Sequence, residues 1–143
     1  MTATEVCMPT HQGLSVFIID DNEMTRGLLR VIIQGEQYDV VGDAGTAESA
    51  QLRLRSQRAD IICLDVQLPD GDGLDLLNWI RAKQPKAAVL MVTASTERST
   101  VEQALRNGAK GYIVKPFNPG TVMNTLDKIA GQIKAARAAE RPA

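Results

Sequence analysis

The sequence predicts an α/β protein with a five-stranded parallel sheet covered by helices on both faces. Five short apolar runs alternate with five helical patterns along the 143 residues. The runs recur at intervals of roughly 20 to 27 residues, which suits βαβ units with right-handed crossovers. Hydrophobic residues make up 44% of the chain, enough to cover a sheet on both sides. A single doubly wound domain is therefore expected.

The first strand and helix follow a polar leader. Residues Ser15–Ile19 form an apolar run that ends in two adjacent acids, Asp20 and Asp21. The next residues repeat with helical spacing and place Met24, Leu28, Val31 and Ile32 on one face. We expect this stripe to be the apolar face of the first helix.

The second strand, the second helix and the third strand lead to the next acid. A shorter strand is expected at Tyr38–Gly42, and Thr46 is a plausible N-cap for a helix from Ala47 to about Gln57. The apolar run Ile61–Leu64 then ends directly in Asp65 and a loop rich in Pro, Gly and Asp. A continuous apolar run bounded by turn residues is typical of a strand buried on both faces.

The third helix is expected to begin after Asp72 as its N-cap and to end before Pro85. Its inward residues are Leu74, Leu77 and Ile80.

The last strands and helices follow the same alternation. Ala87–Val92 is a buried strand followed by Thr93, and Gly111–Val114 runs into Lys115 and Pro116. The helix between them places Val101, Ala104 and Leu105 inward and closes at Gly108. Asn118 and Pro119 are an N-cap and first-turn proline for a final helix with an apolar stripe at Val122, Leu126, Ile129 and Ile133.

The strand count favours the flavodoxin-like strand order 2-1-3-4-5 among the doubly wound folds. This order places the carboxyl ends of the first and third strands side by side, where ligands of such sheets bind. We therefore expect Asp20, Asp21 and Asp65 to converge.

Three convergent carboxylates require a cation, because two unit charges about 4 Å apart repel by on the order of 4 kcal/mol at an effective dielectric of 20. An oxygen-only ligand set favours Mg²⁺. Zinc is a poor candidate, because these strand ends carry neither His nor Cys. Thr93 adds a hydroxyl and Lys115 an ammonium at the same edge. This constellation suits a phosphoryl group, which an aspartate can accept as an acyl phosphate.

Each residue also has a simpler interpretation. Asp20, Asp21 and Thr93 could cap helices, Lys115 could be a surface charge, and Tyr112 could pack at the edge of the core. The joint occurrence of five strand-end positions in this order argues against that interpretation.

The chain resembles the receiver domain of response regulators in two-component signalling. The resemblance lies in the order of the strand-end residues, with Pro69 and Gly73 after Asp65 and with Tyr112 before Lys115-Pro116. The resemblance spans about Leu14 to Ile133. It implies that Asp65 is the phosphoacceptor. Asp21, Asp65 and the backbone carbonyl of Gln67 would ligate Mg²⁺, with Asp20 acting mainly through a coordinated water.

The resemblance also implies a switch. Thr93 and Lys115 would contact the phosphoryl oxygens, Tyr112 would follow the Thr93 hydroxyl inward, and the Lys115-Pro116 peptide would be cis. The donor would be a histidine kinase or a histidine phosphotransfer protein. The downstream protein would bind the surface of the fourth helix, fifth strand and fifth helix.

Alternatives remain for the activity and the extent of the protein. Phosphatases of the haloacid-dehalogenase type share the strand-end Asp nucleophile and Mg²⁺, but usually carry a second Asp where this chain has Gln67. A flavodoxin-like or nucleotide-binding module is disfavoured, since no glycine-rich phosphate loop follows the first strand. The receiver could be a stand-alone regulator or part of a longer one with an output domain.

Composition and charge narrow the partners and the location. The chain has 16 Lys and Arg against 17 Asp and Glu, which gives no overall charge signature for nucleic acid or for an anionic membrane. Neither a signal peptide nor a membrane span is indicated, and two isolated cysteines suit a reducing compartment, so a cytoplasmic protein is expected. The expected organisation is a leader over residues 1–13, a receiver domain over 14–134, and a tail or linker over 135–143.

Overall fold

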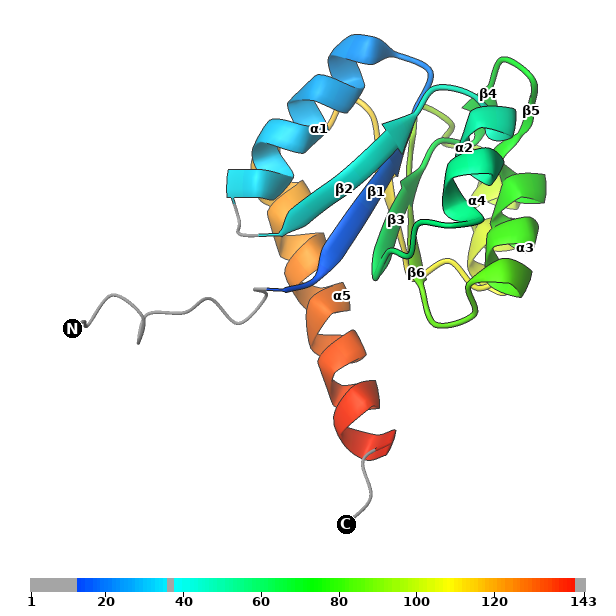
Figure 1. Ribbon diagram of the computed structural model, residues 1–143. Helices are drawn as coiled ribbons and strands as arrows, with labels where there is room; N and C mark the ends of the chain where they lie inside the picture. Colours follow the sequence, from blue (N-terminus) through cyan, green and yellow to red (C-terminus); the bar gives the residue numbers. More distant parts are fainter. Residues whose placement is uncertain (1–12, 36–37, 141–143) are drawn as a thin grey trace.

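The computed structural model describes residues 13–35 and 38–140, which form a parallel five-stranded sheet with helices on both faces (Figure 1). Its strands lie in the order β2-β1-β3-β6-β7, which confirms the expected order 2-1-3-4-5. The strands are β1 (Ser15–Ile19), β2 (Asp39–Ala44), β3 (Ile61–Leu64), β6 (Ala88–Thr93) and β7 (Gly111–Val114).

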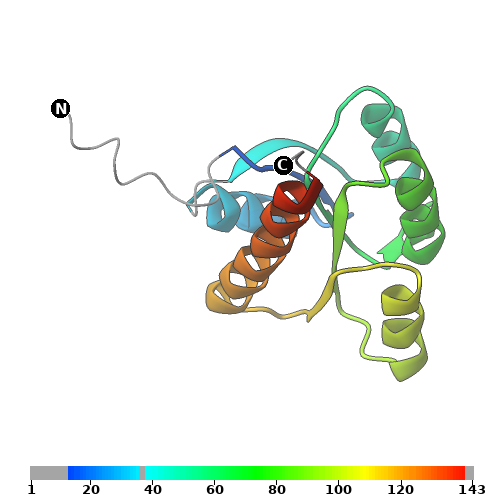
Figure 2. The same ribbon diagram turned by 90° about the horizontal axis from the view of Figure 1, so that it is seen from below.

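Two layers of helices enclose the sheet (Figure 2). One layer consists of α1 (Glu23–Gly35) and α5 (Pro119–Glu140), and the other of α2 (Ala47–Leu54), α3 (Gly73–Lys83) and α4 (Arg98–Arg106). Because successive strand side chains point to opposite faces, each central strand contributes to both layers. In β1, Val16 and Ile18 pack towards α1 and α5, whereas Phe17 and Ile19 pack towards α2 and α3.

The prediction of the apolar face of α1 is wrong. Met24, Leu28 and Val31 are exposed, at 85%, 51% and 69%. The helix is instead rotated so that Leu29, Ile32 and Ile33 pack on the sheet, and of the expected stripe only Ile32 is buried. Both stripes have helical spacing, and the pattern alone could not rank them.

The loop after β3 contains a short antiparallel hairpin that was not expected from the sequence, formed by β4 (Gln67–Leu68) and β5 (Gly71–Asp72). At its tip, the Asp70 carboxylate accepts hydrogen bonds from the backbone N–H groups of Ala47 and Glu48, at 2.7 and 2.9 Å. These N–H groups belong to the first turn of α2, where orphan donors need partners. The hairpin is thereby fixed to the neighbouring helix.

The expected helix caps are confirmed. Thr46 accepts a hydrogen bond from Ser49 N, Asp72 from Leu74 N, and Asn118 from Thr121 N, each within the first turn of its helix. Gly108 follows α4 with a φ of 107°, a left-handed conformation that favours glycine.

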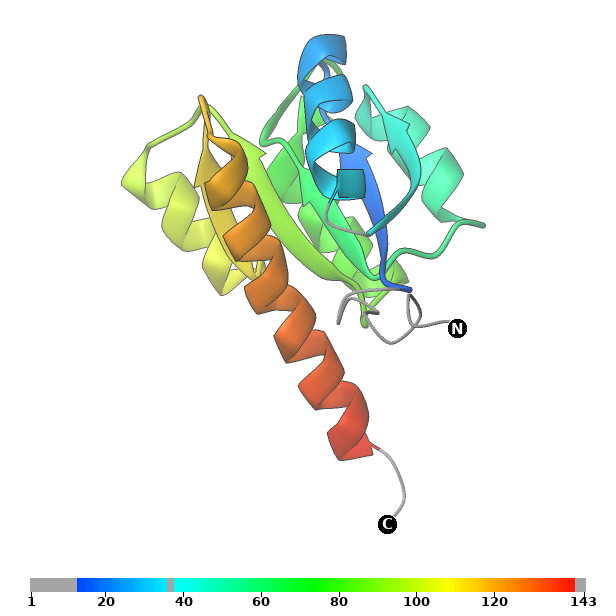
Figure 3. The ribbon, with the colours of Figure 1, turned by 90° about the vertical axis from the view of Figure 1, so that its left-hand side faces the viewer.

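The helix ends differ from the expected ones. Helix α2 ends at Leu54, short of Gln57, whereas α5 continues to Glu140 through six of the residues expected to form a tail. The last turns of α5 extend beyond the sheet (Figure 3). Residues 1–12 of the expected leader and residues 141–143 lie outside the described part of the chain. In the described ranges no helix combines the length and apolar character needed to cross a membrane.

Candidate functional site

Three carboxylates meet at the carboxyl edge of the sheet because β1 and β3 are adjacent. Ile19 pairs with Leu64 in the parallel register, so the next residue of each strand, Asp20 and Asp65, lies at the same level. The ladder continues past the strand ends, where Asp65 N donates to the carbonyl of Ile19 at 3.0 Å. With Asp21, these residues offer carboxylate oxygens that all lie within 4.8 Å of one another.

Lys115 binds two of these carboxylates. Its Nζ lies 2.6 Å from Asp20 Oδ2 and 2.9 Å from Asp65 Oδ2. The backbone N–H of Lys115 donates to the carbonyl of Thr93 at 2.8 Å, which aligns the end of β7 with the end of β6. The Lys115-Pro116 peptide bond is cis. The lysine therefore reaches the acidic edge from the end of β7, the strand at the edge of the sheet.

Burial and the ion pairs with Lys115 shift the pKa values of the groups in the site. Asp20 is 1% exposed, and desolvation raises the pKa of its carboxyl despite the opposing hydrogen bonds from Lys115 and Asn22. The pKa of Lys115 is also raised, since the two carboxylates outweigh the burial that opposes its charge. Apart from the ion pair with Lys115, Asp20 Oδ2 has no partner among the described residues. The site thus contains a buried carboxylate oxygen that is incompletely satisfied.

Thr93 and Tyr112 lie on neighbouring strands beside this edge. Thr93 is fully buried at the end of β6. Tyr112 is partly buried against the core on the same side of the sheet as α2, α3 and α4, and its hydroxyl donates to the Ser95 carbonyl at 3.0 Å. Because Ser95 lies two residues after Thr93, the tyrosine contacts the segment that carries the threonine hydroxyl.

The donor set fits a hard divalent cation. The three carboxylates supply oxygen ligands only, which is the preference of Mg²⁺. The buried Asp20 oxygen, which has only the Lys115 ammonium as a partner among the described residues, and the mutual repulsion of the acids give a cation a favourable place. Gln67 N donates to Asp65 Oδ1 at 3.1 Å, so the residue whose carbonyl is the expected fourth ligand adjoins the cluster.

Two supporting residues have roles that only the folded chain defines. A Cβ on Gly73 would overlap the Asp65 carbonyl oxygen and approach Val66 Cα to 2.6 Å, so glycine permits α3 to start against the backbone of Asp65 and Val66. Arg26 of α1 donates from Nη1 to the Asp20 carbonyl at 2.6 Å. Gly73 was predicted from the sequence as part of a motif but without this reason, and no sequence signal indicated Arg26.

The doubly wound fold and the acidic edge define an α/β protein with a cluster of carboxylates that could hold a metal ion at the switch point of its sheet. Comparison with known families makes the assignment specific, since residues 16–127 match the response regulator receiver domain. The chemotaxis protein CheY of Listeria monocytogenes is 35% identical over 117 residues, which cover 82% of this chain and 98% of that protein. The chain belongs to the response regulator receiver domain family.

Solved structures agree with this assignment. The CheX-CheY-BeF3-Mg²⁺ complex of Borrelia burgdorferi matches with a TM-score of 0.79 and 28% identity, covering 82% of this chain and 90% of that one. A response regulator of Burkholderia pseudomallei, solved with a phosphorylated aspartic acid, a calcium ion and citrate, matches with a TM-score of 0.74 and 29% identity. It covers 90% of this chain and 75% of that one.

Proposed function

We propose that this receiver domain is a phosphoacceptor switch of a cytoplasmic two-component system or phosphorelay, with Asp65 as the acceptor. The observation that carries the proposal is the position of the Asp65 carboxylate, at a strand end, in a cluster with Asp20 and Asp21 and in contact with Lys115. The phosphorylated aspartic acid of the Burkholderia pseudomallei protein supports the same chemistry.

In the proposed reaction, an Asp65 oxygen attacks the phosphorus of a phosphohistidine on the donor protein. A P–O bond forms, the P–N bond breaks, and the donor imidazole leaves. Lys115 neutralises charge on the phosphoryl oxygens, and the Thr93 hydroxyl donates to one of them. Mg²⁺, held by Asp21, Asp65 and the Gln67 carbonyl with Asp20 beneath, would offset the remaining negative charge.

The arrangement of Tyr112 supports a conformational readout. Its hydroxyl is already bonded to the Ser95 carbonyl, so a shift of Thr93 towards a phosphoryl group changes the space that this ring occupies. Full switching between two states takes about 5.5 kcal/mol of differential interaction. We propose that the surface of α4, β7 and α5 presents this change to a downstream protein.

We propose that the exposed stripe of α1, defined as Met24, Leu28 and Val31, binds the histidine donor. Leu28 also lines a hollow of about 380 Å³ that reaches Lys115, Pro116 and Phe117. An apolar surface beside the acceptor edge suits a protein that must place a phosphohistidine next to Asp65.

The decisive experiment offers acetyl phosphate to the protein with and without Mg²⁺ and measures acyl phosphate on intact chains by mass spectrometry. We expect one phosphoryl group per chain, only with Mg²⁺, and none on Asp65→Asn. Asp75→Asn, an exposed acid on α3, is the matched control and should label normally. Labelling of Asp65→Asn would contradict the acceptor assignment, and sustained release of many phosphates per chain would favour a phosphatase.

A further inference from the structure

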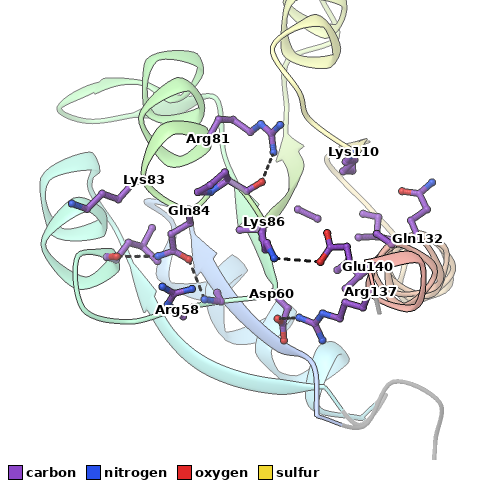
Figure 4. Close-up of a pocket in the computed structure, with 18 of the residues that line it drawn as sticks. Arg58, Asp60, Arg81, Lys83, Gln84, Lys86, Lys110, Gln132, Arg137 and Glu140 are labelled. Atoms are coloured by element: carbon purple, nitrogen blue, oxygen red, sulfur yellow. Dashed lines mark hydrogen bonds and ion pairs between the residues drawn. The ribbon is translucent and has the colours of Figure 1, made fainter. Parts of the chain in front are cut away.

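A basic cavity lies at the amino end of the sheet, opposite the acidic edge. It has a volume of about 790 Å³ and is enclosed by the segment after α2, the end of α3, the start of β6 and the last turns of α5. Figure 4 shows side chains from these segments around one hollow. Ligand-binding cavities commonly measure about 300 to 1,000 Å³.

The charge of this cavity contrasts with that of the whole chain. Seven of its lining residues are Lys or Arg and two are acids, although the full sequence has a net charge of -1. Both acids are engaged, since Asp60 pairs with Arg137 and Glu140 with Lys86. Asp60 also accepts from the backbone N–H of Ser15 at 2.8 Å. A surplus of positive charge remains among the residues that line the cavity.

The surplus is carried by side chains without acidic partners. Within residues 13–35 and 38–140, Arg58, Lys83 and Lys110 form no ion pair, and they come from three different segments. Arg81 donates only to the carbonyl of Pro85. Like charges gathered in this way repel one another, and an anion that enters between them relieves the repulsion.

The cavity floor is a fixed structure. The Gln84 side chain donates to the carbonyls of Leu54 and Gln57, each at 2.9 Å, and accepts from Ala59 N at 3.2 Å. These three bonds fasten the segment between α2 and β3 to the end of α3. On the opposite side, the pairs of Arg137 and Glu140 hold the last turns of α5 in place as a wall.

We propose that this cavity binds a compact polyphosphate anion of the size of a nucleoside triphosphate. Arg and Lys are the side chains that bind phosphate oxygens, Arg in a bidentate manner. The volume holds a molecule of this size but not a macromolecule. No aromatic residue lines the cavity, so base stacking contributes nothing and the phosphates dominate recognition. ATP, GTP and inorganic tripolyphosphate should therefore bind alike, and adenosine should not bind.

Isothermal titration calorimetry with ATP tests this proposal, with EDTA present so that no metal bridges the nucleotide to the acidic edge. We expect saturable binding with one site per chain and an affinity that falls as salt increases. The double variant Lys83→Gln, Lys110→Gln should bind at least about tenfold more weakly, which is the loss of one charge-assisted hydrogen bond or more. The control Arg106→Gln, Lys128→Gln removes the same charge outside the cavity and should bind as the wild type does.

The result with each ligand and each variant supports or overturns the proposed anion site. Binding of tripolyphosphate as tight as that of ATP supports recognition through phosphates, whereas binding of ATP without binding of tripolyphosphate overturns it. No heat with either ligand at millimolar concentration overturns the proposal, as does an equal loss in both double variants. Binding of duplex DNA or phosphatidylglycerol vesicles without binding of ATP or tripolyphosphate would also overturn it.

Discussion

Asp20 is buried beneath the acidic edge, and desolvation, the largest influence on its carboxyl, raises its pKa above the ordinary value of 3.8. The folded state therefore holds a proton on Asp20 more tightly than the unfolded state does. The protonated Asp20 carboxyl therefore contributes stability that is fully present below the ordinary pKa and is lost as the pH rises through the raised pKa of the folded state. At neutral pH the ionised carboxylate thus destabilises the metal-free protein.

We predict that Asp20→Asn increases the free energy of unfolding of the metal-free protein at pH 7, because an amide does not ionise. The gain should shrink as the pH falls through the raised pKa of Asp20, and it should be lost below the ordinary value of 3.8, where the carboxyl is protonated in both states. Urea unfolding in EDTA at several pH values measures both effects. Asp21→Asn is the control, since Asp21 is exposed and should change stability little. Equal stability of Asp20→Asn and the wild type at pH 7 would refute the prediction.

At the scale of the elements, the start of α3 sets the local geometry of the site. Gly73 begins α3 against the carbonyl of Asp65 and donates its N–H to the carbonyl of Val66 at 2.6 Å. There is no room for a side chain between this helix and the backbone of Asp65 and Val66. The position of Asp65 relative to α3 therefore depends on glycine.

Gly73→Ala should lower the free energy of unfolding by at least about 2 kcal/mol, because the new methyl group must displace backbone atoms. It should also slow labelling of Asp65 by acetyl phosphate. Gly27→Ala is the matched comparison, since Gly27 lies within α1 with open space around it. There the substitution should stabilise by about 0.5 to 1 kcal/mol. Urea unfolding of both variants compares them, and a neutral Gly73→Ala would contradict the close contact.

Leu28→Ser should lower kcat/KM for transfer from a phosphohistidine donor by roughly tenfold, the effect of losing about 1.4 kcal/mol of apolar contact. Labelling by acetyl phosphate, which needs no protein surface, should stay unchanged. Leu52→Ser removes a leucine of similar exposure on α2 and serves as the control. If the rates of transfer from the phosphohistidine donor and from acetyl phosphate fall equally, the substitution acts on the site around Asp65 and not on docking.

The elements also show how far the sequence predicts this structure. Strand positions and order followed from the apolar runs, since buried parallel strands leave a strong local signal. The acidic cluster followed from that order. The rotation of α1 did not, because Met24, Leu28 and Val31 repeat with the same period as the residues that are buried, Leu29, Ile32 and Ile33. Which stripe packs depends on the sheet, and a functional apolar surface resembles a core stripe in sequence.

At the scale of the whole molecule, ligand binding at the acidic edge is coupled to folding. A cation that binds only the folded state stabilises it by about 2.7 kcal/mol at one hundred times its dissociation constant. We predict this gain for the wild type when Mg²⁺ is added to the EDTA-treated protein, as measured by urea unfolding. Asp65→Asn should gain much less, and sodium chloride at equal ionic strength should not reproduce the effect. An equal gain in both proteins would place the cation elsewhere.

The basic cavity could not be predicted from composition or from local patterns. Its cations come from the end of α3, from separate loops and from the last turns of α5, and the net charge of the sequence is close to zero. Only the fold brings Arg58, Lys83 and Lys110 to one place. The continuation of α5 to Glu140 was missed for a related reason. An Ala- and Arg-rich segment has high helix propensity, but its ion pairs with Lys86 and Asp60 are distant in sequence.

Helix α5 joins the two ends of the molecule. It begins four residues after Lys115 and ends at Glu140 beside the basic cavity, a length of about 33 Å at 1.5 Å per residue. A rigid rod of this length that pivots about its middle by a few degrees moves each tip by roughly 1 Å, in opposite directions. Any reorientation of α5 at the acidic edge would thus be transmitted mechanically to the far rim, without a chain of intervening side chains.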